Sequence, residues 1–178
     1  MSTLTSITPI QRISRTQELL DKGLESLKQE EVLTLLMDPE DPESIKTAER
    51  LLNEHISLYD LSKNRSNAET LMEVAGMTAI DAVRVAAAAH LAEQFSTTQP
   101  IADPATENLL ADVLGPEITQ PRCREWAKEL LTQAGSLKGL LELDLNASAE
   151  ARNIDFLSLT RLLASLEMAV RVEQAASM

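Results

Sequence analysis

Apolar residues recur at spacings of three and four along most of the chain, which is the pattern of amphipathic α-helices. The densest stretch is 67–95, where small and apolar residues leave only a narrow polar strip, and residues 85–92 include no Asp, Glu, Lys or Arg. A helix that is apolar nearly all round belongs in the interior of a protein. The pattern therefore predicts a long central Ala-rich helix over about 67–95, with Gly76 as its weakest position, where a kink or a close helix crossing is expected.

A narrower apolar stripe runs through the N-terminal region, after the helix-start pair Thr8 and Pro9. Its spacing is close to that of a two-helix seam, with Gln17 as the one polar member. The stripe predicts either packing on the protein's own core or docking to another chain. A bend or a new helix start is expected near Gln29, because the later apolar residues leave this register. The candidate docking residues are Ile13, Leu20, Leu24 and Leu27.

Proline and glycine divide the rest of the chain into further helices. The DPEDP sequence at 38–42 predicts a break, with a helix from Pro42 to about Lys63. The polar, aperiodic stretch 96–103 predicts a linker. Further helices are expected from Pro104 to Gly115, from about Pro121, and over about 148–175.

Composition supports one helical domain. The chain has 178 residues, only 2% of them aromatic, with five Gly and no alternating strand pattern. We therefore predict an all-α multi-helix bundle of about six helices around the central helix, with a core of Leu, Ala, Val, Ile and Met. A three-helix unit at 1–95 and a helical unit at 104–178, joined by the linker 96–103, are expected to pack as one domain.

Charge and cysteine usage limit the surroundings in which this protein acts. The formal net charge of −12 disfavours general contact with nucleic acid or with an anionic membrane, and suits solubility or a basic protein partner. The acidic residues of 38–43 are interpreted as caps and turns, with docking to a basic partner as the alternative. A single cysteine and the lack of a long apolar segment favour a cytoplasmic location.

The sequence contains no recognisable reactive motif. His55 and His90 are the only histidines, they lie on or beside apolar stripes, and no zinc or di-iron spacing surrounds them. Cys123 lies on a helical stripe that predicts burial, although the flanking Arg122 and Arg124 allow a reactive thiol as the alternative. We expect no catalytic, cofactor-binding or metal site, and hence no enzyme.

Two functional hypotheses follow. The first is a non-catalytic helical protein-protein interaction module, such as an adaptor, a chaperone, an inhibitor or an assembly component, binding another protein or itself as a homo-oligomer. The alternative is a small helical DNA-binding regulator that uses the basic segment containing Arg122, Arg124 and Lys128.

Overall fold

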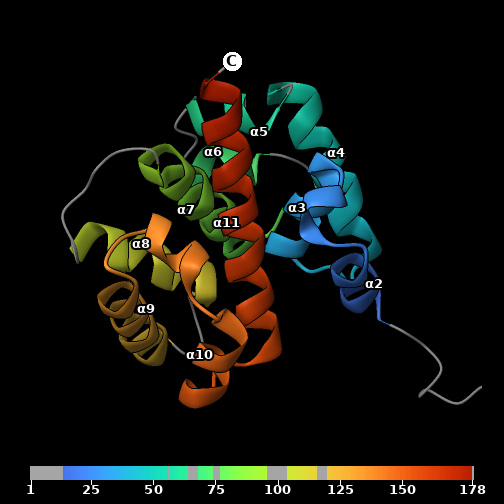
Figure 1. Ribbon diagram of the computed structural model, residues 1–178. Helices are drawn as coiled ribbons and strands as arrows, with labels where there is room; N and C mark the ends of the chain where they lie inside the picture. Colours follow the sequence, from blue (N-terminus) through green and yellow to red (C-terminus); the bar gives the residue numbers. More distant parts are fainter. Residues whose placement is uncertain are drawn as a thin grey trace, which may run out of the picture.

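The structure is a computed structural model that describes residues 14–55, 57–63, 68–73, 77–95, 104–115 and 120–177. Within these ranges it contains ten α-helices, two 3-10 helices and no strand, which confirms the all-α prediction, although the helices are shorter and more numerous than expected. The first half folds into α2 (Arg15–Asp21), η2 (Leu24–Ser26), α3 (Gln29–Leu36), α4 (Pro42–His55), α5 (Leu58–Lys63), α6 (Ala68–Met72) and α7 (Ala79–Phe95). The second half folds into α8 (Pro104–Leu114), α9 (Gln120–Ala134), η3 (Lys138–Glu142), α10 (Leu145–Arg152) and α11 (Phe156–Ala176) (Figure 1).

The Ala-rich helix α7 lies in the interior, as predicted. It packs against α3, α5, α6, α8 and α11. Its side chains from Val85 to Ala89 are all buried. Small side chains allow these neighbours to approach the α7 backbone closely, so alanine at the centre of the bundle is a packing requirement.

The prediction of one helix over 67–95 is wrong. Helix α6 ends at Met72 and α7 begins at Ala79, with Met77 and Thr78 outside any helix. The Thr78 hydroxyl accepts a hydrogen bond from the backbone N–H of Asp81 at 3.1 Å, which caps the free end of α7. The interruption falls beside Gly76, which itself lies outside the described residues.

The N-terminal stripe is also divided, although the expected restart at Gln29 is confirmed. Helix α2 ends at Asp21, and Gly23 adopts a positive φ of 86°, which interrupts the helix before η2. Helix α3 then begins at Gln29. The continuous stripe expected as far as Leu27 is therefore divided between α2 and η2, and Leu27 itself follows η2.

Among the other predicted helix boundaries, some are confirmed and some are wrong. Helix α4 begins at Pro42 as predicted, but a break after His55 separates it from α5, which ends at the expected Lys63. Helix α8 spans the range predicted from Pro104. The last predicted helix is divided in two, because Asn153 has a left-handed φ of 57° that ends α10. The predicted linker 96–103 lies outside the described residues.

Helix α11 connects the two halves of the chain. It contacts α3, α5 and α7 from the first half and α8 and α10 from the second, and Figure 1 shows it running through the length of the bundle. The buried apolar residues of both halves belong to one core cluster. No helix among the described residues is both long enough and apolar enough to cross a membrane.

Candidate docking groove

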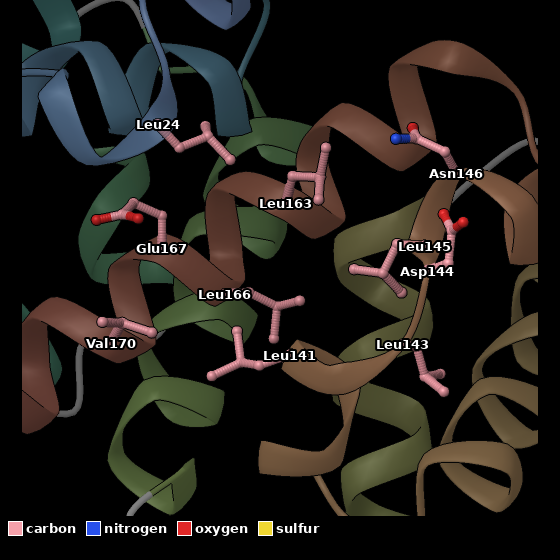
Figure 2. A pocket seen from close by; sticks show the side chains of 10 residues that line it. All are labelled: Leu24, Leu141, Leu143, Asp144, Leu145, Asn146, Leu163, Leu166, Glu167 and Val170. Atoms are coloured by element: carbon pink, nitrogen blue, oxygen red, sulfur yellow. The ribbon is translucent and has the colours of Figure 1, made fainter.

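An open groove of about 320 Å³ lies between α11 and the segment that joins η3 to α10. We call it the Leu24 groove. Seven of its ten lining side chains are aliphatic, and Figure 2 shows Leu141 and Leu166 next to one another near its centre. The lining residues are Leu24, Leu141, Leu143, Asp144, Leu145, Asn146, Leu163, Leu166, Glu167 and Val170.

One wall is a face of α11. Leu163, Leu166 and Val170 follow one another at spacings of three and four, so they lie on one side of the helix. The distance from Leu163 to Val170 along the helix is about 10 Å, or two turns. This wall is rigid, because the opposite face of α11 is packed in the core.

The other wall is a non-helical connection. Leu143 and Asp144 are extended, with ψ angles of 148° and 90°, between the end of η3 and the start of α10. The Asp144 carboxylate accepts a hydrogen bond from the N–H of Ala147 at 3.1 Å, which caps α10. Leu141 remains 49% exposed, an unusual state for a leucine beside several others.

Arg171 holds Leu24 at the end of the groove. Its Nη2 donates to the carbonyl oxygens of Leu24 and Leu27 at 3.0 and 2.7 Å. Its Nε donates to the Glu167 carboxylate at 2.7 Å, so the guanidinium is oriented from its own helix. Hydrogen bonds to a charged group are stronger than neutral ones, and these fix η2 against α11.

The charged groups of the groove lining are both acidic. Asp144 is exposed, so its carboxylate is accessible to solvent. Glu167, in contrast, forms an ion pair with Arg171. Glu142, on η3 beside the groove, is also exposed. The groove is therefore a leucine surface with an acidic edge, in a chain whose net charge is −12.

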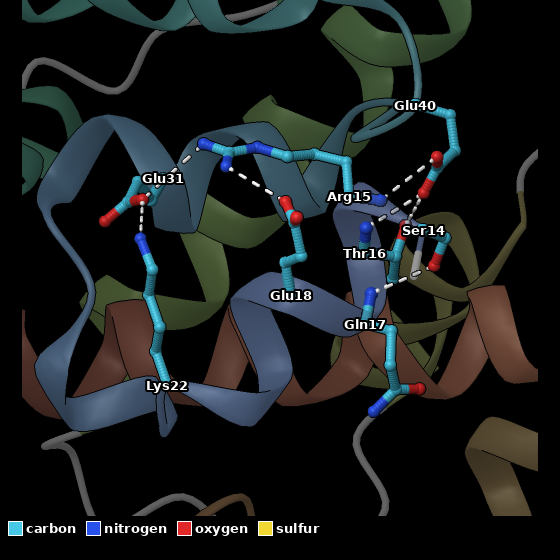
Figure 3. Close-up of polar contacts among 8 residues, drawn as sticks. All are labelled: Ser14, Arg15, Thr16, Gln17, Glu18, Lys22, Glu31 and Glu40. Carbon is cyan, nitrogen blue, oxygen red and sulfur yellow. Dashed lines mark hydrogen bonds and ion pairs between the residues drawn. The ribbon is translucent and has the colours of Figure 1, made fainter. Parts of the chain in front are cut away.

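A polar cluster fixes α2, which precedes the groove residue Leu24 in the chain (Figure 3). The Glu40 carboxylate accepts hydrogen bonds from the N–H groups of Arg15 and Thr16, at 3.2 and 2.8 Å, and from the Thr16 hydroxyl at 2.6 Å. These bonds, led by the one from the Thr16 hydroxyl, lower the pKa of Glu40. Thus a residue of the α3–α4 loop caps the start of α2.

Glu31 anchors the other end of this cluster. Its carboxylate accepts a hydrogen bond from the Lys22 ammonium at 3.0 Å and from the N–H of Lys28 at 3.0 Å, and it lies 3.6 Å from the Arg15 guanidinium. Desolvation by burial raises the pKa of Glu31, but the hydrogen bonds from Lys28 and Lys22 outweigh it and lower the pKa overall. The cluster therefore connects α2 to α3 through Glu31 and to the α3–α4 loop through Glu40.

The structure separates the four predicted docking residues. Leu24 lines the groove, Leu20 is half-buried against the core, and Leu27 is buried with 4% of its surface exposed. Leu19, rather than Leu20, is the α2 residue that is completely buried. Ile13 lies outside the described residues. The predicted stripe therefore contributes one residue, Leu24, to the groove.

Sequence reasoning missed the rest of the groove. A helix over about 148–175 was predicted, but no candidate docking residue was predicted on it or in the segment before it. The available signal is the alternation of Leu141, Leu143 and Leu145 across a short segment that is not helical throughout. In an extended segment residues at every second position share one face, so this spacing predicts an apolar face that a helical stripe does not account for.

The basic residues of the alternative hypothesis lie on α9. The Arg122 guanidinium lies 4.7 Å from the Trp126 ring centre and donates to the carbonyl of Asn153 at 3.5 Å. Arg124 and Lys128 are exposed. The same helix also exposes Glu125 and Glu129, so its surface charge is mixed. DNA contact through this segment stays a prediction.

A partly buried ionic cluster lies between α7 and α11. Arg84 donates to Asp81 at 3.3 Å, and Arg161 donates to the carbonyl of Met37 at 3.2 Å. Burial lowers the pKa of Arg84 to about 10, with repulsion from Arg161 as the next cause. Burial also raises the pKa of Asp81, although Arg84 opposes it.

Two further residues of interest have packing positions. Cys123 is buried, as its stripe predicted, and His90 is half-buried. Within the described ranges, no three His, Cys, Asp or Glu side chains converge as metal ligands would. Comparison with family models, with curated proteins and with solved structures finds no match to this chain, so the groove is interpreted from its own residues.

Proposed function

We propose that this chain is a non-catalytic protein-interaction module that binds an apolar segment of another protein in the Leu24 groove. The supporting observation is the gathering of leucine side chains from three separate elements, η2, η3–α10 and α11, around one open concavity. Concentrated exposed apolar surface marks interaction sites in soluble proteins.

The form of the groove favours a protein segment over a small molecule. Its volume of about 320 Å³ is at the low end of the range of about 300–1,000 Å³ for small-molecule pockets. The groove is open along two turns of α11, and both of its walls present leucine side chains. Such a surface suits apolar anchors that project from a longer chain.

Leu141→Asp is the sharpest test, because Leu141 is half exposed and its replacement by a charge does not disturb the core. Leu157→Asp is the matched control: Leu157 is 41% exposed and lies on α11 outside the groove lining. Both variants and the wild type would be used as bait in extracts of the source cells, and bound proteins would be quantified by mass spectrometry. A partner whose recovery falls at least about tenfold with Leu141→Asp but not with Leu157→Asp supports the proposal, since a desolvated apolar anchor contributes 1.4 kcal/mol or more.

Two results would contradict the proposal. In one, no protein's recovery depends on Leu141. In the other, light scattering of the purified wild type gives the mass of two chains, and Leu141→Asp returns it to 19.5 kDa. That result would place a second copy in the groove and overturn the separate partner.

A further inference from the structure

We infer that the segment bound in the Leu24 groove is a cationic amphipathic α-helix. This inference rests on the proposed function and adds the secondary structure and the charge of the partner. Two features of the groove lead to it: the periodicity of its helical wall and the sign of its polar edge.

The helical wall determines the spacing of the partner's anchors. Leu163, Leu166 and Val170 present side chains over about 10 Å, the rise of two helical turns. A partner helix lying along α11 offers apolar side chains at i, i+3 or i+4, and i+7 over the same length. The opposite wall contributes Leu141 from η3, Leu143 from the extended connection and Leu145 from the start of α10, so its leucines also follow one another along the groove.

The shortness of the extended connection also favours a helix over an added strand. The segment at Leu143 and Asp144 is only a short extended connection between two helical elements, so it offers few backbone groups to pair with a strand. Side-chain packing therefore supplies the contact. Helix-in-groove recognition depends on such packing.

Charge identifies the polar face of the partner. Asp144 in the lining and Glu142 beside it are exposed carboxylates, whereas Glu167, the other acidic side chain of the lining, is paired with Arg171. Among the residues that the structure describes, no Lys or Arg side chain lines the groove. A helix with Lys or Arg beside its apolar stripe meets complementary charge here, whereas an acidic helix meets repulsion.

The test uses three synthetic 16-residue peptides with an N-terminal fluorophore. The first has Leu at i, i+3, i+7 and i+10 with Lys at the flanking positions. The second replaces each Lys by Glu, and the third has the composition of the first in an order without a helical apolar face. Fluorescence anisotropy measures Kd for the full chain at 50 and 300 mM NaCl. The protein variants are Leu141→Asp, Leu157→Asp, and Asp144→Asn combined with Glu142→Gln.

We expect the Lys peptide to bind at least about tenfold more tightly than the Glu peptide and the reordered peptide, and high salt to weaken it. Leu141→Asp should raise Kd at least tenfold and Leu157→Asp should not. Asn at position 144 retains the cap of α10, and Glu142 is exposed, so this double variant should stay folded. It should bind the Lys peptide about three- to tenfold more weakly and lose most of its salt dependence, because each exposed ion pair contributes about 0.2–1 kcal/mol.

Other outcomes would overturn the inference. Equal binding of the Lys and Glu peptides would remove the charge argument, and equal binding of the reordered peptide would remove the helix. If the Lys peptide fails to bind while a cellular partner still depends on Leu141, the proposed docking role stands and the cationic helix is wrong. If neither depends on Leu141, both proposals fail.

Discussion

The Nη2 atom of Arg171, near the end of the chain, donates a 2.7 Å hydrogen bond to the carbonyl oxygen of Leu27, near its beginning. The two residues are 144 positions apart. The same nitrogen reaches the carbonyl of Leu24 at 3.0 Å. One guanidinium therefore closes the 3-10 turn η2 against α11 and places Leu24 at the edge of the groove.

This relationship predicts that Arg171→Met destabilises the protein by about 2 kcal/mol. The methionine retains much of the apolar stem, but it leaves two partly buried carbonyls and the Glu167 carboxylate without their donor. Hydrogen bonds to a charged group contribute about 1.5–3 kcal/mol. Urea unfolding at neutral pH, followed by circular dichroism, measures the change.

Lys46→Met is the control for this substitution. Lys46 pairs only with Glu43 at an exposed site, where both side chains are more than half exposed. Its loss should change the free energy of unfolding by less than about 0.5 kcal/mol. If Arg171→Met is no more destabilising than Lys46→Met, Arg171 does not hold η2 in place.

The cap that Glu40 provides for α2 predicts a pH-dependent contribution to stability. The folded state lowers the pKa of Glu40 below its ordinary value of 4.5. The stabilisation is therefore complete above the unfolded pKa and is lost as the pH falls through the folded one. Glu40→Ala should cost about 1 kcal/mol at pH 7, and this difference from the wild type should shrink towards pH 3.

Urea unfolding of the wild type and Glu40→Ala at pH 7, 5 and 3.5 checks this dependence. Glu43→Ala is a suitable control, because the exposed Glu43 carboxylate pairs with Lys46 and lies outside the α2 cap. A difference between wild type and Glu40→Ala that stays constant with pH would show that the carboxylate charge contributes nothing to the cap.

The class of fold could be predicted because apolar residues recur at helical spacing along most of the chain. The interior position of α7 follows from a stretch with no charged residue between Arg84 and Glu93, which no surface helix would have. Pro42 and Pro104 set two helix starts correctly, because proline suits the first turn. Periodicity and proline are local signals, and both are visible in one sequence.

The interruptions were harder to predict. Asn153 ends α10 by adopting a left-handed conformation, and Thr78 begins α7 by capping Asp81, yet neither residue interrupts the apolar period. The groove was missed for a different reason. Leu163 and Leu141 look like core residues in the sequence, and only the tertiary arrangement leaves a space between their two segments. Which apolar residues lack neighbours is decided by packing over long separations, which local patterns do not contain.

The alanines of α7 predict intolerance to larger side chains. Ala88 has no exposed surface and lies on a helix that packs against α8 and α11. Ala88→Leu adds three carbon atoms to a close-packed space, which should cost about 1–3 kcal/mol. Ala79→Leu, at the exposed start of the same helix, should change stability by less than about 0.5 kcal/mol. Equal effects of the two substitutions in thermal unfolding would contradict a close-packed centre.

The pair Asp81–Arg84 predicts an asymmetric double-mutant cycle. Their side chains are 14% and 10% exposed, and they are 3.3 Å apart. Arg84→Met leaves the Asp81 carboxylate buried without its closest cation, although Thr78 and Arg161 still favour its charged form, and this should cost about 3 kcal/mol. Asp81→Asn should be less destabilising, because the Asn amide oxygen can still accept a hydrogen bond from Arg84. Part of a cost remains, since the carboxylate charge no longer offsets the repulsion between the Arg84 and Arg161 guanidinium groups.

The double variant decides how the pair contributes. Replacing both charges removes the desolvation cost together with the attraction, so Asp81→Asn with Arg84→Met should be more stable than Arg84→Met alone, with a coupling free energy of about 1–2 kcal/mol. Urea unfolding of the four proteins gives this value. Additive effects would mean that solvent screens the two charges from each other. The 10% exposure of the Arg84 side chain and the lowering of its pKa by burial both argue against such screening.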